Sequence, residues 1–154
     1  MAATFSISAI GTVKGGRARA EDDAWGASRA AIELDASFSA DALAGLDGFS
    51  HAEIIFIFDR LSESEITTSA RRPRGNPDWP LVGIFAQRGR NRPNRIGVSV
   101  CRIVAVNGTR LEVEGLDAID GTPVIDIKPV LRGFLPRSAI REPEWAAAIM
   151  ADYW

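Results

Sequence analysis

The sequence predicts a mainly β protein whose single sheet curls into a barrel, with short helices around it. Six or so short β-like segments follow one another without the strand–helix alternation of a parallel sheet. Two turn signals, Asn107-Gly108 and Asp120-Gly121, separate the last of these segments. Closure into a barrel leaves few strand edges exposed, which favours it over an open sheet.

The first third of the chain contains two strand signals and one helix signal. Residues 7–13 alternate weakly and predict a first strand, and residues 30–34 predict a second one after a polar loop. A short helix is expected over residues 40–46, because the Ser39 hydroxyl can accept a hydrogen bond from an amide of the first turn.

The most apolar strand signal is AEIIFIF at residues 52–58, which predicts a central strand buried on both faces. Residues 62–79 contain prolines, glycine and arginines with little periodicity. They predict a long excursion that is either mobile or folded over a site. Another β-like run follows at residues 81–86.

The clearest local prediction is a hairpin with arms at residues 96–106 and 109–115. The Asn107-Gly108 pair between them favours the positive φ angles of a tight turn. In the second arm, Leu111 and Val113 alternate with two glutamates, so one face of this strand is expected to be exposed.

The last part of the chain changes from strand to helix. Residues 123–128 predict a final strand, whereas residues 142–154 predict a helix with Pro143 in its first turn. Trp145 and Ile149 fall on one face of that helix. This face either packs on the barrel or meets a second subunit.

Length and composition indicate one soluble domain over residues 1–154. The 46% hydrophobic and 25% charged residues are ordinary globular values, no apolar run has the length of a membrane span, and no secretory signal is evident. Cys101 has no partner for a disulfide, so we expect a cytoplasmic protein. His51 is the one histidine of the sequence, so no metal site is expected. A histidine at the start of a buried strand is more often a structural hydrogen-bonding residue than a catalytic one.

Charge is strongly segregated, although the formal net charge is only -2. Residues 71–110 contain nine arginines and one acid, Asp78, which gives +8 for this stretch and -10 for the rest. A positive surface of this kind attracts polyanions over long range. A solvated arginine-rich loop is the equally open alternative.

Four of these arginines lie on one short loop, at Arg88, Arg90, Arg92 and Arg95. Guanidiniums crowded together are better tolerated where a carboxylate or phosphate binds among them. Pro93 fixes its own φ angle and favours an extended backbone at Arg92, so Arg92 and Asn94 are candidates to bind a carboxylate, a ribose or a phosphate. The alternative is that these residues merely stabilise the turn.

A second polar block, LDAIDGTPVIDIKP, places Asp117, Asp120, Asp126 and Lys128 around a turn and the strand that leaves it. Such a turn can bind a purine edge or a cation, and a salt-bridged structural turn has the same pattern. Neither block alone names a ligand.

Together these blocks resemble the TrmO family, also called TsaA-like or YaeB-like proteins. Residues 83–99 are similar to the family pattern GVFATRSPFRPNPIGLS, and residues 116–130 to DLLDGTPVLDIKPY. Residues 45–58 resemble GLEEFSHLWLLFVF, and residues 10–13 the opening IGVI. The likeness covers most of residues 7–130, leaving 131–154 as a C-terminal tail and helix.

The resemblance implies a homodimeric β-barrel methyltransferase that binds S-adenosylmethionine and methylates N6 of threonylcarbamoyladenosine beside the anticodon of tRNA. By motif it assigns cofactor binding to Trp25, Asp59, Arg60, Phe85, Ala86, Gln87, Arg88, Arg92, Pro93, Asn94, Val98, Leu116, Asp117, Ile119, Asp120, Gly121 and Thr122. We expect the tRNA to contact Arg71, Arg72, Arg74, Arg90 and Arg95. No catalytic residue is assigned, although Asp120 and Asp126 are candidate proton acceptors.

The chain departs from the family pattern at several positions. Gln87 replaces a threonine, Arg95 replaces a proline, and Glu21–Gly26 (EDDAWG) stands where the family carries an RQPGL-like cofactor segment. The longer members have an extra C-terminal domain, so this chain resembles a short form. Two other functions stay open: a module that binds S-adenosylmethionine without methyl transfer, and a methyltransferase for another substrate.

Overall fold

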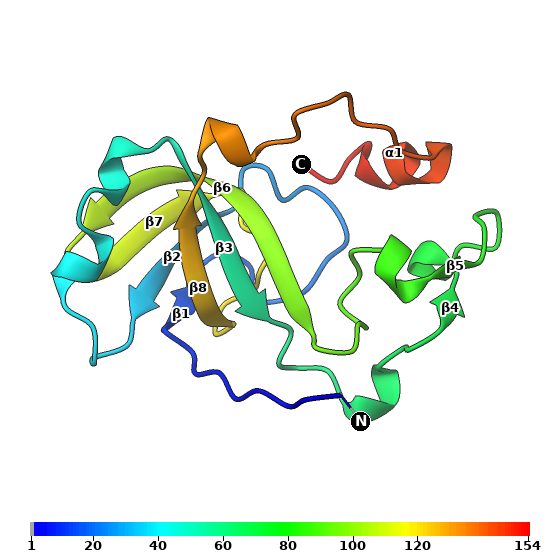
Figure 1. Ribbon diagram of the computed structural model, residues 1–154, viewed down its shortest axis with the longest axis horizontal. Helices are drawn as coiled ribbons and strands as arrows, with labels where there is room; N and C mark the ends of the chain where they lie inside the picture. The colour runs from blue at the N-terminus through cyan, green and yellow to red at the C-terminus, as the bar shows by residue number, and fades with distance from the viewer. Residues whose placement is uncertain (1) are drawn as a thin grey trace.

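The computed structural model describes residues 2–154 as a closed antiparallel barrel with an appended excursion and helix (Figure 1). Six strands close the barrel in the order β1-β2-β7-β6-β3-β8. Their bounds are β1 Gly11–Lys14, β2 Arg29–Leu34, β3 His51–Ile57, β6 Ile96–Asn107, β7 Arg110–Glu114 and β8 Pro123–Pro129. The predicted fold class is therefore confirmed.

The remaining elements are short. Two strands, β4 Ala70–Arg71 and β5 Val82–Gly83, form a separate small sheet. The 3-10 turns are η1 Ala40–Leu43, η2 Leu46–Gly48, η3 Glu63–Glu65, η4 Pro73–Gly75, η5 Ile84–Ala86 and η6 Arg132–Phe134, and the one α-helix of residues 2–154 is α1 Glu144–Met150. Within residues 2–154, no helix has the length and apolar character needed to cross a membrane.

The barrel interior is built from alternate residues of each strand. On β3, Ala52, Ile54 and Phe56 are at most 1% exposed and point inward, whereas Ile55 and Ile57 are only half-buried on the outside. The prediction that this strand is buried on both faces was wrong, because a barrel has one interior and nothing covers the outer face of β3 fully.

The predicted hairpin forms, but its turn is shifted by one residue. Asn107 pairs with Arg110, so the two central residues are Gly108 and Thr109. Gly108 has φ +60°, and Asn107 remains in the strand. A glycine at the first central position is typical of a type II′ turn, which suits the strand twist as well as the Asn-Gly turn would.

Two elements near the N-terminus differ from the sequence prediction. β1 begins at Gly11 rather than at residue 7, since only the backbone amide of Ile10 reaches β8, donating to the Val124 carbonyl at 2.8 Å. Ser39 makes no side-chain cap, and the expected helix is two 3-10 turns interrupted at Gly45, whose φ is +82°.

The excursion over residues 62–79 is folded rather than featureless. Its strand β4 pairs with β5, and the Gln87 side-chain amide joins the two strands by donating to the Arg71 carbonyl at 2.9 Å and to the Val82 carbonyl at 3.0 Å. The predicted strand over residues 81–86 is limited to Val82–Gly83, because the chain turns at Ile84–Ala86.

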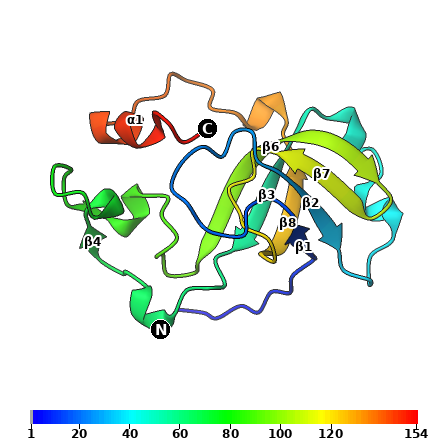
Figure 2. The ribbon, with the colours of Figure 1, turned by 180° about the vertical axis from the view of Figure 1, so that it is seen from behind.

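The helix α1 and the excursion lie on the same side of the barrel in both ribbon views (Figures 1 and 2). Trp145 and Ile149 are half-buried, and Pro143 is the N-cap residue of the helix. After the helix the chain returns toward the barrel, where the Trp25 amide donates to the Tyr153 carbonyl at 2.7 Å. The residues after β8 therefore add a wall beside the barrel opening.

Candidate functional site

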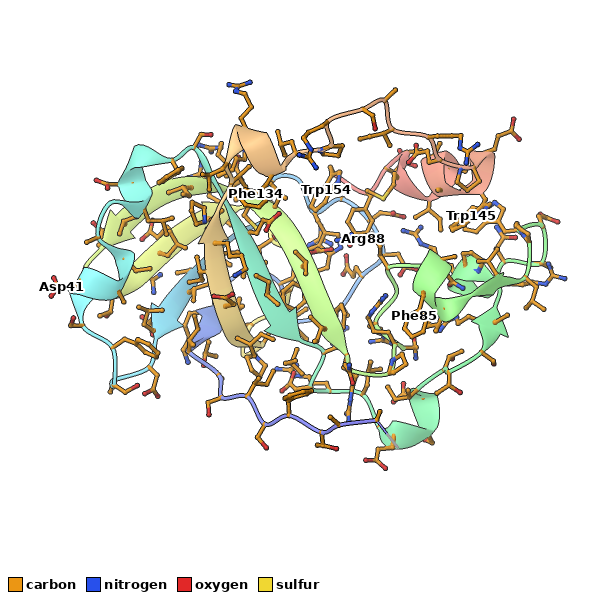
Figure 3. All side chains as sticks on the ribbon, viewed as in Figure 1. Asp41, Phe85, Arg88, Phe134, Trp145 and Trp154 are labelled. Atoms are coloured by element: carbon orange, nitrogen blue, oxygen red, sulfur yellow. The ribbon has the colours of Figure 1, made fainter. Side chains whose placement is uncertain are left out.

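A pocket of about 410 Å³ lies where one end of the barrel meets the arginine loop. Its walls come from β3 and β6, from residues 85–94, and from the segment after β7. The lining residues are Phe56, Phe58, Phe85, Arg88, Arg92, Pro93, Asn94, Ile96, Gly97, Val98 and Asp117. Figure 3 shows Phe85 and Arg88 between the barrel and the excursion.

Seven of the residues proposed for cofactor binding line this pocket: Phe85, Arg88, Arg92, Pro93, Asn94, Val98 and Asp117. The structure thus brings together the arginine loop and the start of the second polar block, which are separated in the sequence. Four further lining residues were not predicted from the sequence, namely Phe56, Ile96 and Gly97 of the barrel and Phe58 just after β3. Only the glycine within an apolar strand was a usable signal.

Gly97 makes the pocket floor possible. It pairs with Phe56 across β3 and β6, and a Cβ added to it would lie 2.5 Å from the Phe56 ring and 3.0 Å from the Phe58 ring. The two rings pack edge to face with centroids 5.2 Å apart. A side chain at Gly97 would displace this aromatic pair from the floor.

The arginine side chains in the pocket are bound to the backbone rather than to acids. Arg88 Nη2 donates to the Val98 carbonyl at 2.8 Å, and Arg92 Nη1 donates to the Gln87 carbonyl at 2.8 Å. Within residues 2–154 neither forms an ion pair with an acidic side chain. Their positive charge and several N–H donors therefore remain available to an anion.

Arg95 has a structural role in the same loop. Its φ is +53°, which a proline ring cannot adopt, so the replacement of the family proline by arginine fits the local backbone. Its Nη1 donates to the Leu61 carbonyl at 2.8 Å and holds the loop to the segment after β3.

Asp117 brings a carboxylate to the pocket wall. The Ser99 hydroxyl donates to its Oδ1, and the Tyr153 hydroxyl donates to its Oδ2. Burial raises the pKa of Tyr153 above its ordinary value, and the nearby Asp117 charge raises it further. Tyr153 therefore stays protonated at neutral pH and remains a donor to Asp117.

The turn after Asp117 lies outside the pocket lining. Asp120 Oδ1 accepts from the Gly15 amide at 2.8 Å, the Asp120 carbonyl accepts from Arg60 Nη2 at 2.9 Å, and Thr122 Oγ1 donates to the Ile119 carbonyl at 2.7 Å. Gly121 has φ +86°. Gly15 thereby joins the turn to the β1–β2 loop and Arg60 joins it to the segment after β3, and the ligand roles of these residues stay predictions.

The other proposed residues fall into three groups. Leu116 is fully buried in the barrel core, while Ala86 and Gln87 precede the pocket arginines and Asp59 follows β3. Of the proposed proton acceptors, Asp126 is ion-paired with Lys128 at 2.8 Å and does not line the pocket.

Trp25 is buried rather than presented to the pocket. It is 3% exposed, its Nε1 donates to the Glu21 carbonyl at 3.0 Å, and the Arg17 guanidinium lies 4.3 Å from its ring centroid. The segment that departs from the family pattern thus packs against the end of the chain, where the Trp25 amide donates to the Tyr153 carbonyl.

None of the five arginines proposed for tRNA lines the pocket. Arg74 pairs with Asp23 at 2.9 Å, and that hydrogen bond raises the pKa of Arg74. Arg72 donates to the Trp79 carbonyl, whereas Arg90 is exposed on the arginine loop. Arg74 is therefore committed to the Glu21–Gly26 segment and Arg95 to the arginine loop, whereas Arg71, Arg72 and Arg90 remain candidates for a polyanion.

Cys101 and potential metal ligands add no reactive centre to this region. Burial in the barrel raises the pKa of the Cys101 thiol to about 12, with Asp117 as a smaller cause, so the thiol stays protonated at neutral pH. Within residues 2–154, no three His, Cys, Asp or Glu side chains are grouped so as to hold a metal ion.

The chain is similar to several known proteins. The family model described as "tRNA-methyltransferase O N-terminal domain" matches residues 20–134. The chain is 42% identical over 98 residues to the tRNA (adenine(37)-N6)-methyltransferase of Escherichia coli, covering 60% of this chain and 40% of that protein. It is also 42% identical over 104 residues to a Pseudomonas aeruginosa protein named "Putative S-adenosylmethionine-dependent methyltransferase RcsF", covering 67% and 45%.

The fold gives the same result. A crystal structure of TrmO from Pseudomonas aeruginosa superposes with a TM-score of 0.72 at 31% identity, over 93% of this chain and 62% of that one. The chain thus spans less than two thirds of each of these three relatives.

Proposed function

Because the chain belongs to the TrmO N-terminal domain family, we propose that it binds S-adenosylmethionine in the pocket and methylates N6 of threonylcarbamoyladenosine beside the anticodon of tRNA. One observation carries the ligand part of the proposal: Phe85 is 78% exposed and lines the same pocket as Arg88 and Arg92. An exposed aromatic ring beside cations without acidic partners suits a nucleoside that carries a carboxylate.

The pocket residues match the groups of this cofactor. A volume of about 410 Å³ lies within the usual range of small-molecule sites. Phe85 offers a ring face to the adenine, Arg88 and Arg92 offer donors to the carboxylate, and Asp117 offers acceptors to the ammonium or ribose hydroxyl groups.

S-Adenosylmethionine supplies a methyl group that the sulfonium already activates. The protein therefore mainly has to position the reactants, and in favourable cases orientation contributes about 7–11 kcal/mol to lowering a barrier. In this proposal the pocket residues hold the cofactor, while Arg71, Arg72 and Arg90 guide the tRNA backbone. We expect the active form to be a homodimer, as the family resemblance implies.

The test compares two exposed phenylalanines, both labelled in Figure 3. Phe85 lines the pocket, whereas Phe134 is 89% exposed and does not. Stacking on a base is worth about 1–3 kcal/mol, so Phe85→Ala is expected to raise the Kd for S-adenosylmethionine about fivefold to 150-fold in calorimetry. Phe134→Ala, the matched control, should bind like the wild type.

Methyl transfer is tested with labelled S-adenosylmethionine and tRNA containing threonylcarbamoyladenosine. Label in the tRNA supports the enzyme. Gln87, which replaces a threonine of the family pattern, favours one second candidate, a binding module without transfer. That candidate predicts normal calorimetry and no label, and absence of binding contradicts both functions.

A further inference from the structure

We propose that Tyr153 is a positioning residue, which holds the Asp117 carboxylate at the pocket wall so that it can accept a hydrogen bond from the bound ligand. The inference rests on the proposed function for the identity of that ligand. Tyr153 lies outside residues 20–134, the stretch that the family model matches, and outside every motif singled out in the sequence.

The contacts of Asp117 leave its carboxylate able to accept further hydrogen bonds from the pocket. Each of its oxygens accepts one hydroxyl proton, from Ser99 on β6 and from Tyr153 after α1. Because each carboxylate oxygen has two lone pairs, one acceptor position on each oxygen remains. Asp117 lines the pocket, so these positions serve an N–H or O–H group of a ligand.

Tyr153 is itself held in place, because the backbone around it is hydrogen-bonded to residues 24 and 25. The Ala24 amide donates to the Asp152 carbonyl at 2.9 Å, and the Trp25 amide donates to the Tyr153 carbonyl at 2.7 Å. The Tyr153 and Trp154 rings pack edge to face with centroids 4.9 Å apart. This two-sided attachment fixes the hydroxyl relative to the barrel.

Gly26 makes this attachment sensitive to a single methyl group. A Cβ at Gly26 would lie 2.6 Å from the backbone carbonyl carbon of Trp154. Since the obstructing atom belongs to the backbone, Gly26→Ala must shift residues 152–154 and thereby move the Tyr153 hydroxyl. This variant disturbs the attachment without altering Asp117 or any pocket side chain.

The first experiment reads the contact without ligand. Tyr153 is the one tyrosine of the chain, so the ultraviolet absorbance of tyrosinate reports on it alone during an alkaline titration. Asp117→Asn and Gly26→Ala should each lower the pH at which Tyr153 ionises, because the first removes a neighbouring negative charge and the second exposes the ring. An unchanged titration in both variants overturns the inference.

The second experiment measures S-adenosylmethionine binding by calorimetry. Tyr153→Phe removes only the hydroxyl and is expected to raise Kd about threefold to tenfold, and Gly26→Ala by a similar factor. The matched control is Ser50→Ala, which deletes the hydrogen bond between Ser50 Oγ and His51 Nδ1, 2.7 Å apart at the far end of β3. It should leave Kd unchanged.

A double-mutant cycle separates positioning from general loss of structure. In an Asp117→Ala background, Tyr153→Phe should change Kd less than twofold, because no carboxylate remains to be positioned. An equal effect in both backgrounds overturns the inference, as does wild-type affinity in Tyr153→Phe. If the wild type itself binds no S-adenosylmethionine, the proposed function fails as well. If the wild type binds it and Tyr153→Phe and Gly26→Ala bind equally well, only the role of Tyr153 is contradicted and the proposed function stands.

Discussion

The arginines of the barrel wall and those of the pocket loop have the same chemistry but opposite electrostatic outcomes. On the wall, Arg29 and Arg102 both pair with Glu114, at 2.8 and 2.9 Å, and Arg110 pairs with Glu33 at 2.9 Å. On the loop, Arg88, Arg92 and Arg95 donate to backbone carbonyls instead. Wall charges are compensated and loop charges are not.

Strand register causes this difference. Glu114 lies directly opposite Arg29 on one side and Arg102 on the other, and Glu33 lies opposite Arg110. Opposed charges on neighbouring strands interact favourably. The loop has no partner strand that could place an acid opposite each arginine, so an external anion can take that place.

The largest expected difference between the two groups comes from substituting one arginine of each. Arg88→Gln should raise the Kd for S-adenosylmethionine about tenfold to a hundredfold, because a charge-assisted hydrogen bond contributes about 1.5–3 kcal/mol. Arg102→Gln should leave Kd unchanged. Calorimetry measures both, and equal effects would show that cross-strand pairing does not divide the two groups.

A smaller difference between unpaired and paired arginines is expected in the salt dependence of tRNA binding. Replacing Arg71 and Arg90 with glutamine should reduce the magnitude of the slope of log association constant against log salt concentration by about 1.5, since each phosphate contact contributes about 0.7–0.9. The paired arginines Arg29 and Arg110, replaced in the same way, should leave the slope unchanged. Filter binding between low and moderate salt gives the slopes, and a large loss in the second variant contradicts the assignment.

The smallest expected effect concerns stability in acid. Hydrogen bonds from Arg102, and then from Arg29, lower the pKa of Glu114 below its ordinary value of 4.5. The stabilisation is therefore present above pH 4.5 and lost as pH falls through the lowered pKa. Arg102→Gln should make the decline in melting temperature below pH 4.5 less steep, whereas Arg88→Gln should not. Thermal unfolding followed by circular dichroism at several pH values checks this.

Much of the fold could be predicted because its signals are local. The hairpin, the buried residues Leu111 and Val113, and the strand after Asp120-Gly121 all follow from alternation and turn residues. Predictions were wrong where the path of the chain, and not the local sequence signal, decided the structure. Ser39 is a good cap residue, yet the chain turns away at Gly45 before an α-helix can form.

The candidate site was predicted in part for the same reason. The arginine loop is a continuous motif, so Arg88, Arg92 and Asn94 could be identified together. The aromatic floor could not, because it depends on the pairing of Gly97 with Phe56, 41 positions apart. Trp25 was grouped with the cofactor residues by its position in the sequence; the structure places it outside the pocket lining, and its ligand role stays a prediction.

The sequence by itself determined the strand pattern, the positive loop and the family, since these depend on residue types at short spacing. Only the tertiary structure decided which charges are compensated and which carboxylate faces the pocket. Asp117 meets Ser99 and Tyr153, which lie 18 and 36 positions away, only because barrel closure and the return of the chain after α1 bring them together. Such contacts depend on the strand register and on the path of the whole chain, which no local pattern encodes.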